Sequence, residues 1–217
     1  DTSSPQEDAG AAILLRTARD REMGQVITQR DKELQRQVYH PQTLGMIEWK
    51  GSRATLYRLL AKLVDMQAIY VIGYLPTDGA PKRVFADRKW HGRIADHEVR
   101  LTRWLKKNGL LEYDCLRGSD VDKECRPDGM IGRLCLELDT GSMNLTRLGG
   151  RLRKYTDTEY IVLVTTYSQK RKENILKQFD FLADKLLVCT EDESECTDCD
   201  GENWLVNEVV KKLQQAQ

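Results

Sequence analysis

The feature of this chain that most constrains its fold is the alternating run from Leu134 to Asp139, Leu-Cys-Leu-Glu-Leu-Asp. A period of two is typical of a β-strand with one buried face, because successive side chains point to opposite sides of the sheet. The leucines are expected to fill a core, and Glu137 and Asp139 are expected to project from the other face. Asp128 begins the strand expected just before this one, so the pattern predicts that three carboxylates converge.

Converging carboxylates suit a divalent cation. Mg²⁺ is held in proteins by one or two carboxylates together with water and phosphate oxygens, and metal ions of this kind assist phosphodiester cleavage. The sequence therefore predicts Mg²⁺ or Mn²⁺ at Asp128, Glu137 and Asp139. A simpler interpretation stays open, in which these acids lie on an ordinary solvated sheet face.

The chain has 217 residues, of which 40% are hydrophobic, and this is enough for one large domain or two modest ones. We expect a flexible arm at residues 1–25 and two domains, at residues 26–90 and 91–217. Because no apolar run is long enough to span a bilayer and the first residues lack the features of a signal peptide, a soluble, cytoplasmic protein without membrane contact is expected. The six cysteines are irregularly spaced, which favours reduced thiols over disulfides.

The formal net charge is zero, but the charges are unevenly distributed along the chain. Residues 155–217 carry 7 Lys and Arg against 13 Asp and Glu, so the preceding part is net basic. Short basic runs at 82–83, 88–89, 151–154 and 170–172 are candidate phosphate contacts. Each run is also compatible with ordinary hydrated surface.

The N-terminal domain has the element order of a winged helix. Thr28 and Asp31 have the spacing of a capping box at the start of a helix. Helices are expected at 28–40, 42–48 and 53–66, and strands at 69–75 and 83–86. In this architecture the third helix enters the major groove of DNA. The DNA-binding candidates are Arg53, Tyr57, Arg58, Lys62, Lys82 and Arg83, and contact with another protein is the alternative role.

The C-terminal domain reads as an α/β sandwich with helices on both faces of a sheet. Helices are expected at 94–107, 145–155, 169–183 and 206–213. Strands are expected at 110–116, 160–166 and 186–189, with one or two further strands within 130–138. A polar loop is expected between the first two strands.

This order resembles the PD-(D/E)XK restriction-endonuclease-like superfamily, with Pro127-Asp128 in one strand, Glu137-Leu138-Asp139 in the next, and a basic helix after it. From about Val26 onward the chain more closely resembles the bacterial replication-relaxation family, which is associated with plasmid replication and relaxation of plasmid DNA. The residues that carry this second resemblance are Ile27 to Asp31, Ala54 to Leu63, Val84-Phe85, His97, Arg126 to Gly129, Glu137 to Gly141 and Leu152 to Tyr155. The resemblance implies an N-terminal winged helix-turn-helix followed by a mixed α/β, restriction-endonuclease-like domain.

The resemblance also implies roles for individual acids. Asp128 corresponds to the metal-binding aspartate of the superfamily, and Glu137 corresponds to its second acid. Glu98, which follows His97, corresponds to the helix acid that supports a metal-bound water. His97 is expected in a supporting role beside the metal or the scissile phosphate.

The chain departs from the superfamily at Asp139, which stands where a lysine ordinarily orients the water and offsets developing negative charge. Lys154 is expected to replace that lysine from the following helix. Arg151 is the alternative for this role and a further DNA-binding candidate.

Two hypotheses of function follow. The first is a metal-dependent DNA endonuclease or nickase that acts in replication or relaxation. The second is a non-catalytic origin-binding or regulatory protein with a degenerate nuclease fold. Both predict double-stranded DNA as a partner, together with replication or mobilisation proteins of a plasmid or mobile element. Apolar positions on the helix at 169–183 are also compatible with a homodimer.

Other constellations carry less weight. A zinc site at Cys189, Cys196 and Cys199 is an alternative to an acidic loop with reduced thiols, but zinc needs four ligands and only one C-x-x-C pair is present. Covalent catalysis through Tyr39, Tyr57 or Tyr155 is not favoured, because the chain has only three histidines and relaxases bind their metal through a histidine cluster.

Overall fold

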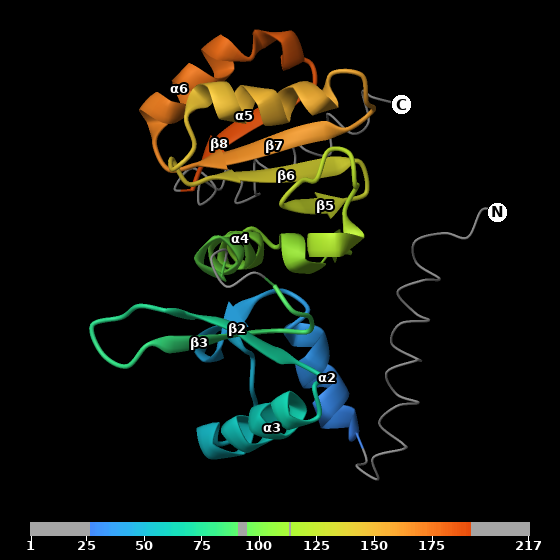
Figure 1. The fold of residues 1–217 in the computed structure, drawn as a ribbon, viewed down its shortest axis with the longest axis vertical. Coiled ribbons are helices and arrows are strands. Elements are labelled where there is room, and N and C mark those ends of the chain that lie inside the picture. The colour runs from blue at the N-terminus through green and yellow to red at the C-terminus, as the bar shows by residue number, and fades with distance from the viewer. Residues whose placement is uncertain (1–26, 91–94, 113, 192–217) are drawn as a thin grey trace, which may run out of the picture. The chain divides into compact units, whose positions relative to one another are not determined.

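The computed structural model describes residues 27–90, 95–112 and 114–191, and the chain divides into two compact units between Val99 and Arg100. The described residues form five α-helices, a three-stranded antiparallel sheet and a five-stranded mixed sheet, which confirms the prediction of a mixed α/β fold (Figure 1). None of the helices within these ranges is both long and apolar enough to cross a bilayer. The arm at 1–25, the expected helix at 206–213, and Cys196 and Cys199 lie outside the described residues.

In the first unit, residues 27–90 form a pair of helices with a small sheet. Its elements are α2 (Gln29–Gln37), β1 (Gln42–Thr43), the 3-10 turn η1 (Leu44–Met46), α3 (Arg53–Asp65), β2 (Tyr70–Leu75) and β3 (Lys82–Ala86). The three strands are antiparallel and lie in the order β1-β3-β2. Strands β2 and β3 form a hairpin whose connecting residues, 76–81, are exposed (Figure 1).

A capping box starts α2, as the sequence predicts. Thr28 Oγ1 accepts a hydrogen bond from the Asp31 N–H (3.2 Å), and the Thr28 N–H donates to Asp31 Oδ2 (2.8 Å). The same carboxylate is fully buried and pairs with Lys62 of α3, Nζ to Oδ2, at 2.6 Å. Burial alone would raise the pKa of Asp31, but the hydrogen bonds from Lys62 and Thr28 lower it overall. One aspartate therefore both caps α2 and joins it to α3.

Helix α3 buries one apolar face and leaves the other in solvent. Ser52 caps it by accepting a hydrogen bond from the Thr55 N–H (3.2 Å). Leu56, Leu60 and Leu63 recur at helical spacing and lie in the core of the unit. Each buried leucine stabilises the fold by roughly 1.5–3 kcal/mol relative to an exposed one. The helix expected at 53–66 is confirmed.

The prediction of a helix at 42–48 is wrong. Gln42 and Thr43 instead pair with Phe85 and Val84 of β3, and only residues 44–46 form a 3-10 turn. Thr43 and Gly45 have low helix propensity, so the pairing with a strand forty residues away decides the conformation of this segment.

The second unit is a five-stranded sheet with helices on both faces. Helix α4 (Ala95–Lys107) crosses the division between the units. The following elements are η3 (Leu110–Glu112), β4 (Cys115–Leu116), η4 (Gly118–Asp120), β5 (Gly129–Ile131), β6 (Leu134–Asp139), α5 (Leu145–Leu152), η5 (Arg153–Tyr155), β7 (Ile161–Thr166), α6 (Gln169–Gln178), η6 (Asp180–Leu182) and β8 (Leu186–Thr190). The sheet order is β4-β5-β6-β7-β8, antiparallel as far as β6 and parallel from β6 to β8.

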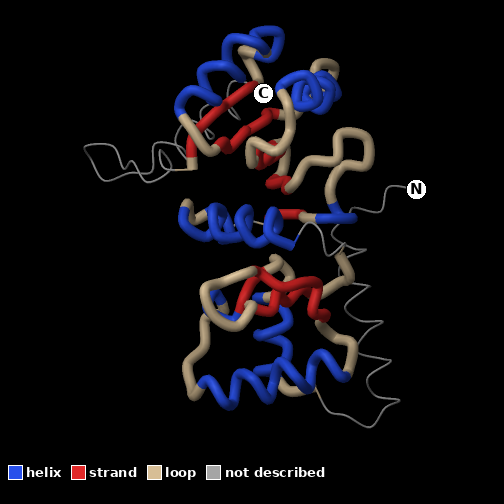
Figure 2. The backbone as a smooth tube through the Cα atoms, turned by 60° about the vertical axis from the view of Figure 1, so that its left-hand side comes forward, coloured by secondary structure: helices blue, strands red, loops and turns tan. Residues whose placement is uncertain are grey.

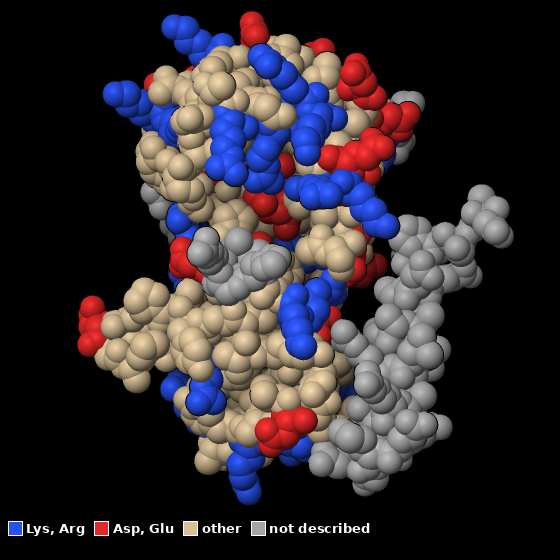
Figure 3. All heavy atoms as spheres, in the orientation of Figure 1, with Lys and Arg blue, Asp and Glu red and all other residues tan. Residues whose placement is uncertain are grey.

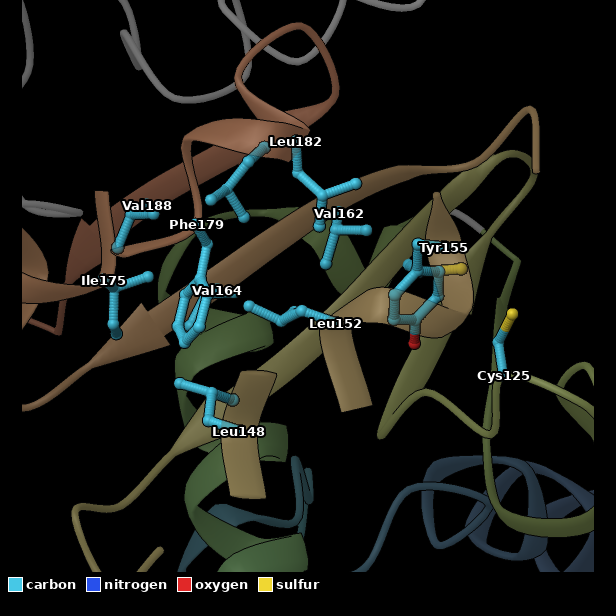
Figure 4. Packing of buried hydrophobic residues seen from close by; sticks show 12 residues of the cluster. Cys125, Leu148, Leu152, Tyr155, Val162, Val164, Ile175, Phe179, Leu182 and Val188 are labelled. Atoms are coloured by element: carbon cyan, nitrogen blue, oxygen red, sulfur yellow. The ribbon is translucent and has the colours of Figure 1, made fainter. Parts of the chain in front are cut away.

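Two apolar layers sandwich this sheet. Leu134, Leu136 and Leu138 face the layer that contains Leu101 and Trp104 of α4, as the alternating pattern predicts. Cys135 and alternate residues of β7 and β8 face α5 and α6 in the other layer. Figure 4 shows part of that second layer, with Leu148, Leu152 and Tyr155 packed near Val162 and Val164. The backbone in Figure 2 shows α5 and α6 on one side of the strands.

The strand expected at 110–116 is largely wrong. Only Cys115 and Leu116 pair with β5, while residues 110–112 form a 3-10 turn. Gly109, with φ 67°, ends α4 and redirects the chain, and Leu110 is buried in the α4 layer instead of pairing. The helix expected at 169–183 is also shorter, because α6 ends at Gln178 and a 3-10 turn follows.

Candidate functional site

The pairing of two strands brings Asp128 and Glu137 together. Asp128 directly precedes β5, and its N–H donates to the carbonyl oxygen of Leu136 on β6 (2.9 Å). Its side chain reaches the same strand, where Oδ2 accepts a hydrogen bond from the Leu138 N–H (2.8 Å). These two bonds flank Glu137 on both sides along β6. The two acids proposed from the sequence as neighbours therefore lie on adjacent strands and side by side.

Arg151 of α5 bridges these two acids. Its Nη2 atom lies 3.2 Å from Asp128 Oδ1 and 2.5 Å from Glu137 Oε2. Glu137 is almost fully buried, whereas Arg151 is half-buried. Burial alone would lower the pKa of Arg151, but the charges of Asp128 and Glu137 raise it. The guanidinium is therefore a permanent positive charge between two carboxylates.

Tyr155 satisfies the remaining oxygen of Glu137. The phenol is fully buried in the layer beneath α5, and its hydroxyl donates to Glu137 Oε1 at 2.7 Å. Burial, followed by the neighbouring charge of Glu137, raises the pKa of Tyr155 far above its ordinary value. A phenol that keeps its proton is a hydrogen-bond donor and a poor nucleophile. Both oxygens of Glu137 are thus occupied by protein donors.

Asp139 belongs to a different cluster. Arg171 of α6 binds its carboxylate with two nitrogens, Nε at 2.7 Å and Nη2 at 3.2 Å. Thr166, at the end of β7, donates its hydroxyl to Asp139 Oδ2 (3.0 Å), and the Gly141 N–H donates to Oδ1 (3.2 Å). The Nη2 atom of Arg171 also donates to the carbonyl oxygen of Met143 (2.7 Å). This network fastens the first turn of α6 to the carboxyl ends of β6 and β7.

The three predicted metal ligands are arranged to bind arginine. Asp128 and Glu137 share Arg151, while Asp139 is bound by Arg171. Among the described residues, no group of three or more His, Cys, Asp or Glu side chains is placed to hold a metal ion. A divalent cation would need the same carboxylate oxygens that these guanidinium groups already bind. In this arrangement Arg151, Tyr155 and Arg171 bind those oxygens, and the Mg²⁺ or Mn²⁺ site stays a prediction.

Arg171 is the residue of the site that sequence reasoning missed. It lies within the basic run at 170–172, which the sequence indicates only as a candidate phosphate contact or as hydrated surface. The carboxyl ends of parallel strands meet at one edge of a sheet, so a basic residue just after β7 was placed to reach an acid at the end of β6. The sequence pattern alone does not select Arg171 from its neighbours Lys170 and Lys172.

The other catalytic candidates have different contacts. Lys154 is exposed, and its Nζ donates to the carbonyl oxygen of Glu124 (3.2 Å), so Arg151 rather than Lys154 is the basic residue that bridges the acids. His97 Nδ1 lies 3.3 Å from Glu98 Oε1. These two residues belong to the N-terminal unit, whereas Asp128 and Glu137 belong to the C-terminal one.

The exposed side of α3 carries two arginines and one acid. Arg53, Ala54, Tyr57, Arg58, Ala61 and Asp65 are all exposed and recur at the spacing of a single helix face. The two alanines have short side chains, so they do not project beyond the arginines. Tyr57 is 55% exposed. The candidate Lys62 is different, because its ammonium group is engaged with the buried Asp31. Lys82 and Arg83 are exposed on the β2–β3 hairpin.

Two adjacent glycines in α5 have different surroundings. A Cβ atom on Gly149 would lie 2.7 Å from Cε1 of Phe179, so close packing of α5 against the segment after α6 requires a glycine there. A Cβ atom on Gly150 would meet no atom of the described part of the chain within 4 Å, and Gly150 is exposed. Neither glycine has a positive φ. Since a glycine within a helix costs about 1 kcal/mol relative to alanine, packing explains only the first of the two.

The described cysteines are buried free thiols: Cys115, Cys125, Cys135 and Cys189. Burial raises the pKa of Cys115 and Cys125 to about 11, so both stay protonated at neutral pH. Cys189 lies in β8, where its sulfur is 3.5 Å from Thr165 Oγ1. The two other members of the predicted zinc set lie outside the described residues.

Comparison with known proteins adds no relative. No protein-family model matches the chain, and searches of curated proteins and of solved structures find no match.

Proposed function

We propose that this chain is a double-stranded DNA-binding protein of a plasmid or mobile element, with an origin-binding or regulatory role and no nuclease activity of its own. Its N-terminal unit acts as a winged helix that holds the duplex. Its C-terminal unit is a restriction-endonuclease-like domain in which arginine side chains form ion pairs with the acids of the site. The observation that carries the proposal is the bridge from Arg151 to Asp128 and Glu137.

The order and pairing of elements support a winged helix in the first unit. Helix α3 lies in sequence between β1 and the β2–β3 hairpin. In the sheet order β1-β3-β2, strand β3 of the hairpin pairs with β1. In such a domain the helix before the hairpin enters the major groove and the hairpin follows the DNA backbone. Helix α3 takes that place, although only α2 and α3 precede the hairpin among the described residues. Arg53 and Arg58, on the exposed side of α3, are suited to phosphates or base edges.

The topology of the second unit supports the restriction-endonuclease-like domain. A helix leads into an antiparallel meander, β4-β5-β6, and a second helix then leads to β7, which is parallel to β6. Asp128 stands at the start of the middle strand of the meander, and Glu137 stands on the third strand. These are the positions that the superfamily pattern assigns to its two acids.

The arginine bridge supports a non-catalytic role for that domain. A nuclease of this type uses free carboxylate oxygens to hold a cation next to the scissile phosphate. Here both oxygens of Glu137 have protein donors, and Asp139 is bound by two nitrogens of Arg171. The charge that a cation would supply is already supplied by the chain.

DNA binding is tested by fluorescence anisotropy with a labelled duplex over a range of salt concentrations. We expect Arg53→Ala and Arg58→Ala each to weaken binding. Each substitution removes one phosphate contact and should reduce the slope of log K against log salt by about 0.9. Lys177→Ala, a change of equal charge at an exposed position of α6, is the matched control and should leave binding unchanged. Equal losses in all three variants, or no binding by the wild-type chain, would contradict the proposal.

A second candidate function is the metal-dependent endonuclease. It is favoured by the retention of Asp128 and Glu137 side by side, within reach of a single guanidinium nitrogen. Magnesium-dependent nicking of plasmid DNA that disappears in Asp128→Asn would establish it in place of the non-catalytic role.

A further inference from the structure

We propose that the outer face of α5 is a second DNA-contacting surface, which binds the phosphate backbone of a duplex independently of α3. This α5 outer face consists of Thr146, Arg147 and Gly150 of α5 and of Arg153 and Lys154 of the following turn η5, all of which are exposed. The inference rests on the proposed function, because it assumes that duplex DNA is the partner.

The first observation is the exposed glycine. Residues three and four positions apart are neighbours on a helix surface, so Gly150 is surrounded by Arg147 on one side and by Arg153 and Lys154 on the other. Among the described residues no atom lies within 4 Å of where its Cβ would be, and its backbone is not in the left-handed region. Neither packing nor conformation therefore requires glycine. A missing side chain at the centre of a basic face lets a phosphate approach the helix backbone closely.

The second observation is the concentration of positive charge. Figure 3 shows Lys and Arg side chains gathered over the part of the C-terminal unit where Figure 1 places α5. Lys154 extends toward the loop before β5 through its bond to the Glu124 carbonyl oxygen. That loop carries exposed Lys123 and Arg126 together with the exposed acid Glu124, so it adds one net positive charge. Arg151 does not contribute in the same way, because the two acids hold it from the inner side of the helix.

Duplex DNA suits the dimensions of this face. Arg147 and Arg153 are six residues apart, which corresponds to about 9 Å along a helix axis. A duplex carries one negative charge for about every 1.7 Å of its length, so a face of this extent spans several phosphates. The absence of an exposed aromatic side chain from the α5 outer face favours backbone contact over stacking on unpaired bases.

The inference is tested with the full chain by anisotropy of a labelled duplex at several salt concentrations. We expect the double variant Arg147→Ala/Arg153→Ala to bind more weakly and to lower the salt slope by about 2, because two phosphate contacts are lost. Gly150→Leu should weaken binding at least tenfold by blocking the approach, while Gly150→Ala should change affinity less than threefold. Lys177→Ala is the control for charge, and thermal melting confirms that each variant remains folded.

The outcomes separate this inference from the proposed function. If the α5 variants bind with wild-type affinity and slope while Arg53→Ala and Arg58→Ala bind weakly, the α5 surface is overturned and DNA binding through α3 stands. If the wild-type chain binds no duplex at all, both proposals are overturned. If Gly150→Leu binds as well as Gly150→Ala in folded protein, the role given to the glycine is overturned.

Discussion

Arg151 and Glu137 form the central contact of the C-terminal unit, with Nη2 lying 2.5 Å from Oε2. The two residues come from α5 and β6, and the same nitrogen also reaches Asp128 at the start of β5. A single side chain thereby joins a helix to two strands. It also fills the position in which an acid pair would otherwise attract a cation.

Replacement of Arg151 is expected to destabilise the C-terminal unit. Arg151→Ala leaves Asp128 and Glu137 next to each other without a compensating charge, and the loss should be about 3 kcal/mol in the free energy of unfolding. Urea unfolding followed by circular dichroism measures this change. Arg147→Ala, an exposed arginine on the same helix, should change stability by less than about 0.5 kcal/mol. Equal stabilities of the two variants would show that the bridge carries little energy.

Removal of the Tyr155 hydroxyl isolates one hydrogen bond. Tyr155→Phe keeps the ring in its layer but removes the donor to Glu137 Oε1. Because the acceptor is a buried carboxylate, we expect a loss of about 1.5–3 kcal/mol in unfolding experiments. DNA affinity should stay at the wild-type level, since the phenol is fully buried and is not available to contact a duplex. A variant of unchanged stability and lost DNA affinity would contradict this assignment.

The N-terminal unit should lose stability in acid through Asp31. Its folded pKa is lowered, so the unfolded state binds more protons and stability rises with pH around the ordinary carboxyl pKa of about 3.9. The contribution is present above that value and disappears as the pH falls toward the lower, folded pKa. Melting temperatures between pH 3 and pH 6 measure the effect. Asp31→Asn should melt lower at pH 6 and show a flatter pH dependence; an unchanged slope would exclude Asp31 as the cause.

The two glycines of α5 should respond oppositely to alanine. Gly150→Ala removes a helix-destabilising residue without a clash and should stabilise the C-terminal unit by about 1 kcal/mol. Gly149→Ala puts a methyl group 2.7 Å from the Phe179 ring and should cost about 1–3 kcal/mol. Urea unfolding of the two variants side by side tests the pair. Stabilisation by both changes would show that α5 is not closely packed at Gly149.

Features that depend on local pattern could be predicted from the sequence. The alternation in β6 predicted which side chains face the core, and the capping box at Thr28 predicted the start of α2. Features that depend on distant partners could not. Strand β1 exists because Gln42 and Thr43 meet β3, and no local signal marks that pairing.

The candidate site divides in the same way. The sequence brought Asp128 and Glu137 together, because strand order and side-chain alternation fix their positions. It did not reveal which basic side chains would bind them. Arg151 and Arg171 lie 23 and 32 residues from the acids Asp128 and Asp139 that they bind. Which of several neighbouring basic residues reaches an acid depends on how each helix is rotated in the packed structure.

The most direct test of the central claim uses supercoiled plasmid DNA with Mg²⁺ or Mn²⁺, at protein concentrations where the plasmid is fully bound. Because Arg151 and Arg171 bind the acids of the site, we expect the plasmid to be still supercoiled after the protein is removed. Nicked or linear plasmid produced by the wild-type chain, and abolished by Asp128→Asn with DNA binding intact, would contradict the claim.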